Sequence, residues 1–331
     1  MIALRVRPVT GLPRLGPGDD LAALLLHAVG PRGLSDGDVL CVSSKAIAKT
    51  EGRSRDADRD DVVDEETDRL VARRGPLRVV RTRHGLVLAA AGVDASNTEP
   101  GTVVPLPVDP DASARMLRAA LHAATGRNVA VVVTDTAGRA WREGQTDVAV
   151  GCAGLPPLVD LAGQTDAYGT VLAVTAPAVA DEVAGAAELV LGKDALTPAA
   201  VATGLGHLVL APGAHGPGAA ALVRPEADDL FGFGALDAVW AAVRRGPTDR
   251  RGFARGDGEL TGLVSAAADG VPLTVVFRPG DATVEARGDA HAAGVLAERL
   301  RVLAWAHGYA VQTGPKGHDP RVWTWLLTPA P

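Results

Sequence analysis

The sequence predicts a mixed α+β fold with a second, smaller α+β module at its C-terminal end. Short apolar runs such as 129–133 are typical of buried strands, whereas 111–125 repeats apolar residues at helical spacing. The 331 residues are 47% hydrophobic and 22% charged, so the chain can bury a large core. A stretch rich in Arg, Gly and Asp predicts a linker at 246–258, between a domain at 1–245 and a module at 259–331.

The first domain alternates between predicted strands and helices. Strands are expected at 2–9 (an edge strand), 39–42, 77–82, 86–91, 129–133, 147–152 and 170–175. Helices are expected at 21–29, 64–74, 111–125, 177–191 and 235–244. Asp19 or Asp20 is placed to cap the first of these helices. The densely charged stretch 53–61 predicts a solvated loop without a site, and 199–202 and 207–210 are short apolar pieces.

The C-terminal module has the predicted order helix, strand, strand, helix, strand, strand. These elements are expected at 260–268, 273–277, 283–287, 290–307, 309–312 and 322–327. Their length is sufficient for a small independent α+β unit. Three tryptophans in this region favour a small aromatic core over a binding platform, and the sequence does not indicate the role of the module.

Composition excludes several function classes. The formal net charge is -6 and the pI is about 5.8, which does not match the basic surface of a nucleic-acid binder. Cys41 and Cys152 lie in apolar strand-like stretches, so buried free thiols are expected. The N-terminus lacks the apolar core of a signal peptide, and no apolar run reaches about 18 residues. We therefore expect a cytoplasmic protein that binds neither nucleic acid nor membrane.

The segment from Thr134 to Asp147 carries the strongest chemical signal. An apolar run leads directly into Thr134-Asp135-Thr136, which predicts a site at the carboxyl end of a buried strand. The Asp135 carboxylate can bind a divalent cation, while Arg139 and Arg142 can bind phosphate or carboxylate. Metal-bound nucleotide and a carboxylate substrate fit this set. The alternative is a strand end closed by a Thr/Asp turn, with two solvated arginines.

Common nucleotide and hydrolase motifs are missing. Gly192-Lys193 lacks the earlier glycine and the following Ser or Thr of a Walker A loop. No glycine triplet has dinucleotide-fold spacing, and no G-x-S-x-G segment is present. A nucleotide site in this chain must therefore be built from other residues.

Several segments together carry a family resemblance. They include Gly11-Leu12-Pro13, Ser43-Ser44-Lys45, the stretch from Ala91 to Asn97, the stretch from Thr134 to Arg142, and the stretch from Gly144 to Gly151. They follow one another in family order over roughly residues 1–245. On these motifs the chain resembles the coenzyme F420-0:L-glutamate ligase (CofE) family, including the ligase domain of the two-domain FbiB proteins.

The resemblance implies an activity and a set of ligands. It implies addition of L-glutamate to the carboxylate of coenzyme F420-0 through an acyl phosphate, with GTP converted to GDP and phosphate. It also implies Mn²⁺ or Mg²⁺, a monovalent cation such as K⁺, and a CofE-like fold that forms an intertwined homodimer. The tail beyond residue 245 does not resemble the flavin-binding half of FbiB, so no flavin is expected.

The resemblance also assigns residues. The metal ligands of the family correspond to Asp94, Asp135 and Thr136. Catalytic roles fall to Asp135, Arg139 and Arg142, and we assign the two arginines to a phosphate or carboxylate of the coenzyme. The nucleotide contacts correspond to Leu12, Pro13, Arg14, Leu15, Ser43, Ser44, Lys49, Asn97, Gly192 and Lys193.

Two departures from the family pattern keep alternatives open. Lys193 stands where some members have an acidic or amide metal ligand, so it either replaces part of the charge of a second metal or leaves that metal with fewer ligands. Val201-Ala202-Thr203-Gly204 lacks the usual arginine. The first alternative is a catalytically impaired GTP-binding protein that acts through its tail as an interaction module. The second is a ligase for a related carboxylate.

Overall fold

The computed structural model describes residues 3–30, 33–191, 197–244, 259–315 and 318–330. The chain divides into two compact units, Met1–Arg224 and Pro225–Pro331. Helix α6 (Ala235–Arg244), which we predicted as the last element of the first domain, falls in the second unit. The predicted linker at 246–258 lies outside the described residues.

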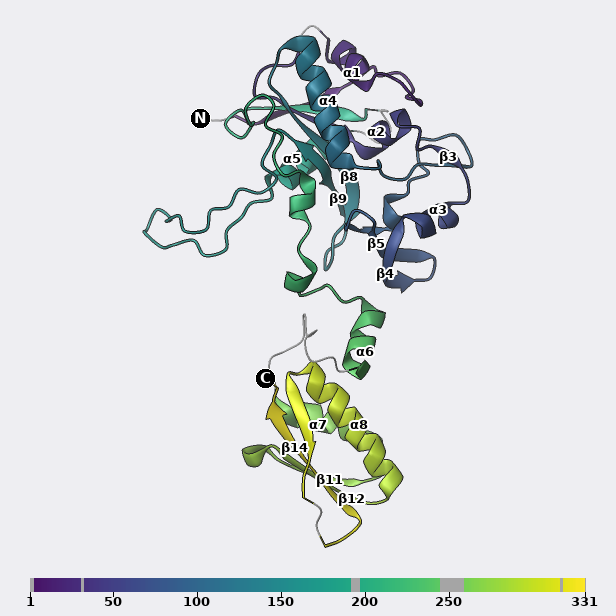
Figure 1. The fold of residues 1–331 in the computed structure, drawn as a ribbon, viewed down its shortest axis with the longest axis vertical. Helices are drawn as coiled ribbons and strands as arrows, with labels where there is room; N and C mark the ends of the chain where they lie inside the picture. The colour runs from purple at the N-terminus through teal and green to yellow at the C-terminus, as the bar shows by residue number, and fades with distance from the viewer. Residues whose placement is uncertain (1–2, 31–32, 192–196, 245–258, 316–317, 331) are drawn as a thin grey trace. The chain divides into compact units, whose positions relative to one another are not determined.

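A five-stranded mixed sheet forms the centre of the first unit (Figure 1). Its strands, in spatial order, are β1 (Arg5–Val9), β10 (Ala199–Thr203), β2 (Val39–Ser43), β8 (Ala130–Gly138) and β9 (Gln145–Ala153). The pair β2–β8 is parallel, and the other three pairs are antiparallel. The predicted strand at 2–9 is confirmed at the edge of this sheet.

Helices cover both faces of the sheet, because successive strand residues point to opposite sides. Val131 and Val133 face a core shared with α1 (Leu21–Val29) and α4 (Pro110–Thr125). Cys41 and Val132 face α5 (Val179–Glu188) on the other side. Asp20 caps α1 as predicted, accepting from Ala23 N at 3.0 Å. Both cysteines are free and buried, which confirms the prediction.

A smaller region beside the sheet corrects two predictions. The predicted helix at 64–74 is wrong, because α3 (Arg59–Glu66) ends early and β4 (Thr67–Arg74) follows it. The predicted loop at 53–61 is also wrong, since it holds β3 (Arg55–Asp56) and the start of α3. Two features explain why α3 forms here: Asp58 caps the helix, and Val62 and Val63 are buried. The other strands here are β5 (Leu77–Thr82), β6 (Val87–Ala89) and β7 (Thr102–Val103).

β4, β5 and β6 form a three-stranded antiparallel sheet, and β3 pairs with β7. The pair β5–β6 confirms the strand pair predicted on either side of the turn at Arg83-His84-Gly85. This region places the loop that follows β6 close to α2 (Ser44–Thr50), the helix that begins where β2 ends.

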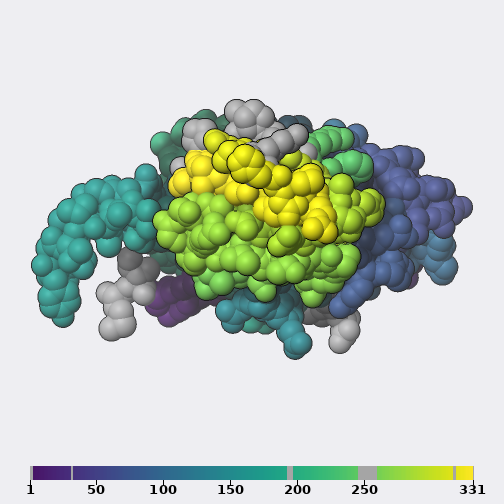
Figure 2. All heavy atoms as spheres, turned by 90° about the horizontal axis from the view of Figure 1, so that it is seen from below, coloured from purple at the N-terminus to yellow at the C-terminus, as the bar shows by residue number. Residues whose placement is uncertain are grey.

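A long hairpin-like arm over 157–177 projects from the first unit (Figures 1 and 2). The strand predicted at 170–175 is wrong, because the arm has one isolated bridge, between Thr165 and Val171, and no regular strand there. Tyr168 is 96% exposed and Val174 is 91% exposed. Without a third strand or a helix to cover these side chains, a two-stranded ribbon is only marginally stable.

The second unit has the element order that the sequence predicts. Its elements after α6 are α7 (Leu260–Ala268), β11 (Thr274–Arg278), β12 (Thr283–Arg287), α8 (Ala290–Ala306), β13 (Tyr309–Thr313) and β14 (Val322–Pro329). The sheet is antiparallel in the order β11-β12-β14-β13. Trp325 is buried against Leu296 and Leu300, which confirms a small aromatic core. Throughout the described residues, no helix is long and apolar enough to cross a membrane.

Candidate functional site

The predicted Thr134-Asp135-Thr136 segment lies inside β8 and not beyond its end. The strand continues to Gly138 and pairs with β9 along this length, so the predicted strand end is wrong for β8. The pairing register shifts between Val133 and Thr134. The neighbouring strand β2 does end here, with Ser43 opposite Thr134 in the parallel pair. The site therefore forms where β2 passes into α2, beside the middle of β8.

Asp135 is the central carboxylate. Ser44, the first residue of α2, donates from Oγ to Asp135 Oδ1 at 2.8 Å. Burial raises the pKa of Asp135 to about 7, because a low-dielectric environment disfavours the charged form. The negative charges of Asp147 and Asp94 contribute to this rise, whereas the hydrogen bond from Ser44 and the charge of Lys45 oppose it. A cation bound at this carboxylate would relieve both effects.

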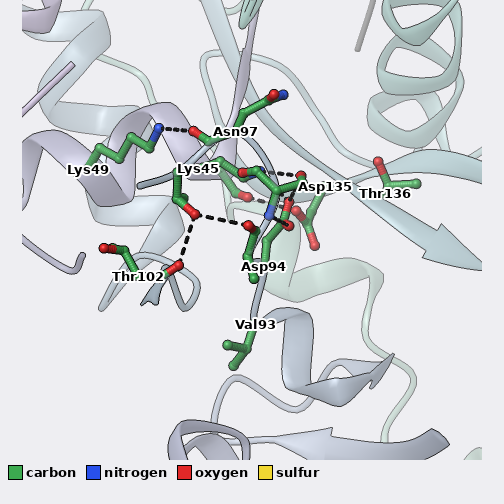
Figure 3. A network of polar contacts seen from close by, with 12 residues as sticks. Lys45, Lys49, Val93, Asp94, Asn97, Thr102, Asp135 and Thr136 are labelled. Atoms are coloured by element: carbon green, nitrogen blue, oxygen red, sulfur yellow. Dashed lines mark hydrogen bonds and ion pairs between the residues drawn. The ribbon is translucent and has the colours of Figure 1, made fainter. Parts of the chain in front are cut away.

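Asp94 lies in the loop that follows the short 3₁₀ helix Ala90–Gly92, and its backbone pairs with Val104. Its Oδ1 accepts from Ser96 N at 2.6 Å, and its Oδ2 accepts from Ser96 Oγ at 3.0 Å. Lys45 Nζ forms an ion pair with the same Oδ2. Burial alone would raise the pKa of Asp94, but Lys45 and Ser96 together hold it below its usual value. Figure 3 shows Asp94, Lys45 and Asp135 in one cluster.

Thr136 points away from this cluster (Figure 3). Because neighbouring strand residues face opposite sides, its hydroxyl meets β9 and donates to Asp147 Oδ1 at 2.8 Å. Thr134 Oγ1 is buried and has no hydrogen-bond partner within the part of the chain that the structure describes. The structure thus brings Asp94 and Asp135 together and sends the Thr136 hydroxyl to a separate acidic partner.

The donor chemistry fits a hard divalent cation. Asp94 and Asp135 offer carboxylate oxygens, the ligands that Mg²⁺ and Mn²⁺ prefer. Among the described residues, no group of three or more His, Cys, Asp or Glu side chains could hold a metal by itself. Mg²⁺ is commonly held by one or two carboxylates together with phosphate oxygens and water. These residues therefore suit a cation shared with a phosphate ligand.

The residues assigned to nucleotide border the same cluster. Lys49 Nζ donates to the carbonyl oxygen of Asn97 at 2.8 Å, and burial together with Lys45 lowers the pKa of Lys49. The loop that contains residues 12–15 reaches the end of α2, where Gly18 N donates to Thr50 O at 2.9 Å. Arg14 forms an exposed ion pair with Glu99 at 3.0 Å. Leu12 and Leu15 pack against the core, and Pro13 is exposed. Gly192 and Lys193 lie outside the described residues.

Arg139 and Arg142 lie in the exposed turn that joins β8 to β9. Arg139 Nη2 donates to Glu143 O at 2.7 Å within the turn, next to the exposed Trp141, whose φ is 64°. Neither arginine contacts Asp94 or Asp135 among the contacts of the described residues. The structure therefore leaves both arginines exposed in this turn, without a described contact to the two carboxylates.

Sequence reasoning did not assign a role to Lys45. Its contact with Asp94 joins residues far apart in the chain, so spacing alone could not reveal it. One signal was available: the chain has four lysines among its 33 basic residues, and two of them are Lys45 and Lys49. A lysine retained in an arginine-rich chain offers a compact, flexible charge that arginine cannot supply.

Comparisons with known proteins match the part of the chain that contains these site residues. The family model described as F420-0:Gamma-glutamyl ligase matches residues 11–204, which contain every assigned site residue. A coenzyme F420:L-glutamate ligase of Methanothermobacter thermautotrophicus is 38% identical over 248 residues, covering 67% of this chain and 96% of the relative. Proteins of the same name from Methanopyrus kandleri and Natronomonas pharaonis are 40% and 42% identical over 224 and 220 residues. They cover 61% and 58% of this chain, and 87% and 83% of the relatives. The chain therefore belongs to the F420-0:gamma-glutamyl ligase family.

Proposed function

We propose that this protein is a GTP-dependent ligase that joins L-glutamate to the carboxylate of coenzyme F420-0 through an amide bond. The observation that carries the proposal is the convergence of Asp94 and Asp135 beside the hydroxyl of Ser44 and the ammonium of Lys45. The family model matches residues 11–204, which include this cluster, and relatives named coenzyme F420:L-glutamate ligase are 38% and 40% identical to the chain.

The chemistry explains why such a cluster is useful. A carboxylate is a poor electrophile, so one of its oxygens first attacks the γ-phosphorus of GTP, and the bond from that phosphorus to GDP breaks. The glutamate nitrogen then attacks the carbonyl carbon, a C–N bond forms, and phosphate leaves as the C–O bond breaks. The amine proton passes to solvent. Alignment and charge neutralisation supply most of the rate in phosphoryl transfers of this kind.

The predicted site residues other than Thr136, Gly192 and Lys193 have the following parts in the proposal. Asp94 and Asp135 hold Mn²⁺ or Mg²⁺, which neutralises charge on the phosphates, and K⁺ assists. Ser43, Ser44, Lys49, Asn97 and the loop from Leu12 to Leu15 bind the nucleotide. Arg139 and Arg142 bind a phosphate or carboxylate of the coenzyme, since paired N–H donors suit either group.

We further propose that the protein works as a homodimer. The arm over 157–177 exposes Tyr168, Val171 and Val174, whose apolar surface is better buried against a second chain. Sedimentation of the purified protein at micromolar concentration should give twice the chain mass, and deletion of the arm tip should reduce it to one.

The activity test is direct. Purified protein incubated with GTP, Mn²⁺, L-glutamate and coenzyme F420-0 should yield a product heavier by one glutamyl unit, with GDP formed in equal amount. Omission of Mn²⁺ or GTP should abolish the product. No mass shift under these conditions would reject the ligase, and GTP binding without consumption would favour the catalytically impaired alternative.

A further inference from the structure

The Lys45 ammonium makes three polar contacts in the cluster. Its ammonium forms the ion pair with Asp94 Oδ2 and donates to Ser96 O at 2.6 Å and Ser96 Oγ at 2.8 Å. An ammonium has three donors, so these contacts use all of them. The Lys45 side chain is 17% exposed, compared with 42% for Asp94. The charge is therefore held in place and largely withdrawn from solvent.

The ammonium occupies an oxygen that a divalent cation would need. Asp94 Oδ1 is engaged by Ser96 N, and Oδ2 is engaged by both Ser96 Oγ and Lys45. A metal coordinates a carboxylate oxygen through a lone pair at about 2.1 Å, and a positive charge on that oxygen opposes its approach. Lys45 and the cation therefore compete for Asp94.

Lys45 is also well placed to leave Asp94 for a phosphate. It lies in the first turn of α2, and Lys49 follows one turn later on the same helix face. The two charges are close enough for Lys45 to lower the pKa of Lys49. Two ammoniums on one face of a helix match the oxygens of a polyphosphate, and the four-carbon stem of lysine can swing between partners.

We propose that Lys45 is a positioning residue that couples the two ligands: it holds Asp94 until a nucleotide phosphate draws its ammonium away, and the cation then binds Asp94. This rests on the proposed function, which supplies both the cation and the nucleotide. The coupling makes the cation bind weakly by itself and tightly in the presence of the phosphate, as linkage requires.

The test is the affinity for Mn²⁺ without nucleotide, measured from the electron paramagnetic resonance signal of free Mn²⁺. Lys45→Met should tighten the Mn²⁺ Kd about tenfold, because the competing charge is removed. Lys49→Met is the matched control, since its ammonium contacts the Asn97 carbonyl oxygen and forms no ion pair with a carboxylate among the described residues. It should tighten the Kd about threefold at most, through general charge removal. Lys45→Gln serves as a second variant if the methionine variant does not fold.

Turnover is a second measurement, and it should change in the direction opposite to the Mn²⁺ affinity. Lys45→Met should lower ligase turnover despite binding Mn²⁺ more tightly, because the ammonium is missing from the phosphate. Removal of a merely structural lysine would tighten Mn²⁺ binding no more than Lys49→Met does.

The outcomes separate the two proposals. Unchanged or weaker Mn²⁺ binding in Lys45→Met, or equal tightening in both lysine variants, would overturn the competition. Asp135→Asn serves as the reference for the site itself. If it binds Mn²⁺ as the unaltered protein does, the proposed metal site fails as well. If Asp135→Asn loses Mn²⁺ and Lys45→Met gains it, both proposals are supported.

Discussion

Two carboxylates in the first unit, the buried Glu66 and the half-buried Asp135, have opposite electrostatic balances. Glu66 accepts from Arg53 Nη2 at 2.8 Å and from Arg83 Nη2 at 2.7 Å. Burial alone would raise the pKa of Glu66, but the two guanidiniums hold it below its usual value. Asp135 accepts from the neutral Ser44 hydroxyl, and its pKa rises to about 7. In the described part of the chain, no guanidinium or ammonium forms an ion pair with Asp135.

This difference separates a structural acid from a functional one. A carboxylate that is already neutralised by two arginines contributes to stability and has little to offer a ligand. A carboxylate that is buried near other acids is held at a cost to folding, and such groups concentrate at binding and catalytic sites. Substitution of each acid should therefore affect stability and turnover in opposite ways.

Asp135→Asn should have the largest effect on function and little effect on folding. Turnover should fall at least about a hundredfold, because charge that neutralises a transferring phosphoryl group is a major catalytic contribution. The free energy of unfolding at pH 7 should stay equal or rise, since a poorly solvated charge is removed. The glutamyl-transfer rate and a urea titration measure the two quantities. Turnover close to that of the unaltered protein would place the reaction elsewhere.

Glu66→Gln should show the reverse behaviour. We expect a loss of about 2 kcal/mol in the free energy of unfolding, because Arg53 and Arg83 lose a buried counterion and Arg55 loses a longer contact at 3.7 Å. Activity per folded molecule should be retained. Glu65→Gln is the control: Glu65 pairs with Arg55 but its side chain is 59% exposed, so the loss should stay below about 0.5 kcal/mol. Equal losses in the two variants would contradict a structural role specific to Glu66.

Much of the fold around these acids could be predicted from the sequence. Continuous apolar runs identified β2 and β8, because buried strands of a covered sheet carry apolar residues on both faces. The order of helices and strands from α7 to β14 was predicted, since these elements have clear periods, whereas the inclusion of α6 in the second unit was not. The charged stretch at 53–61 was misassigned because local polarity hides the two valines at 62 and 63 that α3 buries.

The candidate site was predictable in residue type more than in geometry. Asp135 was chosen for its chemistry, whereas Asp94 entered through the family resemblance. That Thr136 faces Asp147 follows from its position inside β8, which the predicted strand end concealed. The contact between Lys45 and Asp94 depends on a loop folding back onto α2, and no local pattern encodes such a long-range pairing.

Stability should depend on pH in opposite directions at the two acids. Glu66 has a lowered pKa, so its contribution is present above its unfolded value of 4.5 and is lost as pH falls through the folded pKa. Asp135 has a raised pKa, so the folded state binds its proton more tightly, and stability falls as pH rises from 3.8 through about 7.

Metal addition should reverse the effect at Asp135. In EDTA, the unaltered protein should lose about 2–4 °C in Tm relative to Asp135→Asn between pH 5 and pH 8. Saturating Mn²⁺ at pH 8 should recover the lost Tm of the unaltered protein, because a ligand that binds the folded state stabilises it. If the plots of Tm against pH are parallel for the two proteins, with or without Mn²⁺, the ionised Asp135 carboxylate does not destabilise the folded state.

The smallest expected effects compare two hydroxyls on one strand. Thr136→Val removes the donor to the buried Asp147 and should cost about 1–2 kcal/mol of unfolding free energy. Thr134→Val removes a buried hydroxyl without a described partner and should be neutral or stabilising by up to about 1 kcal/mol. Urea titrations of both variants measure the difference. If Thr134→Val instead lowers turnover while stability holds, the Thr134 hydroxyl is a ligand contact.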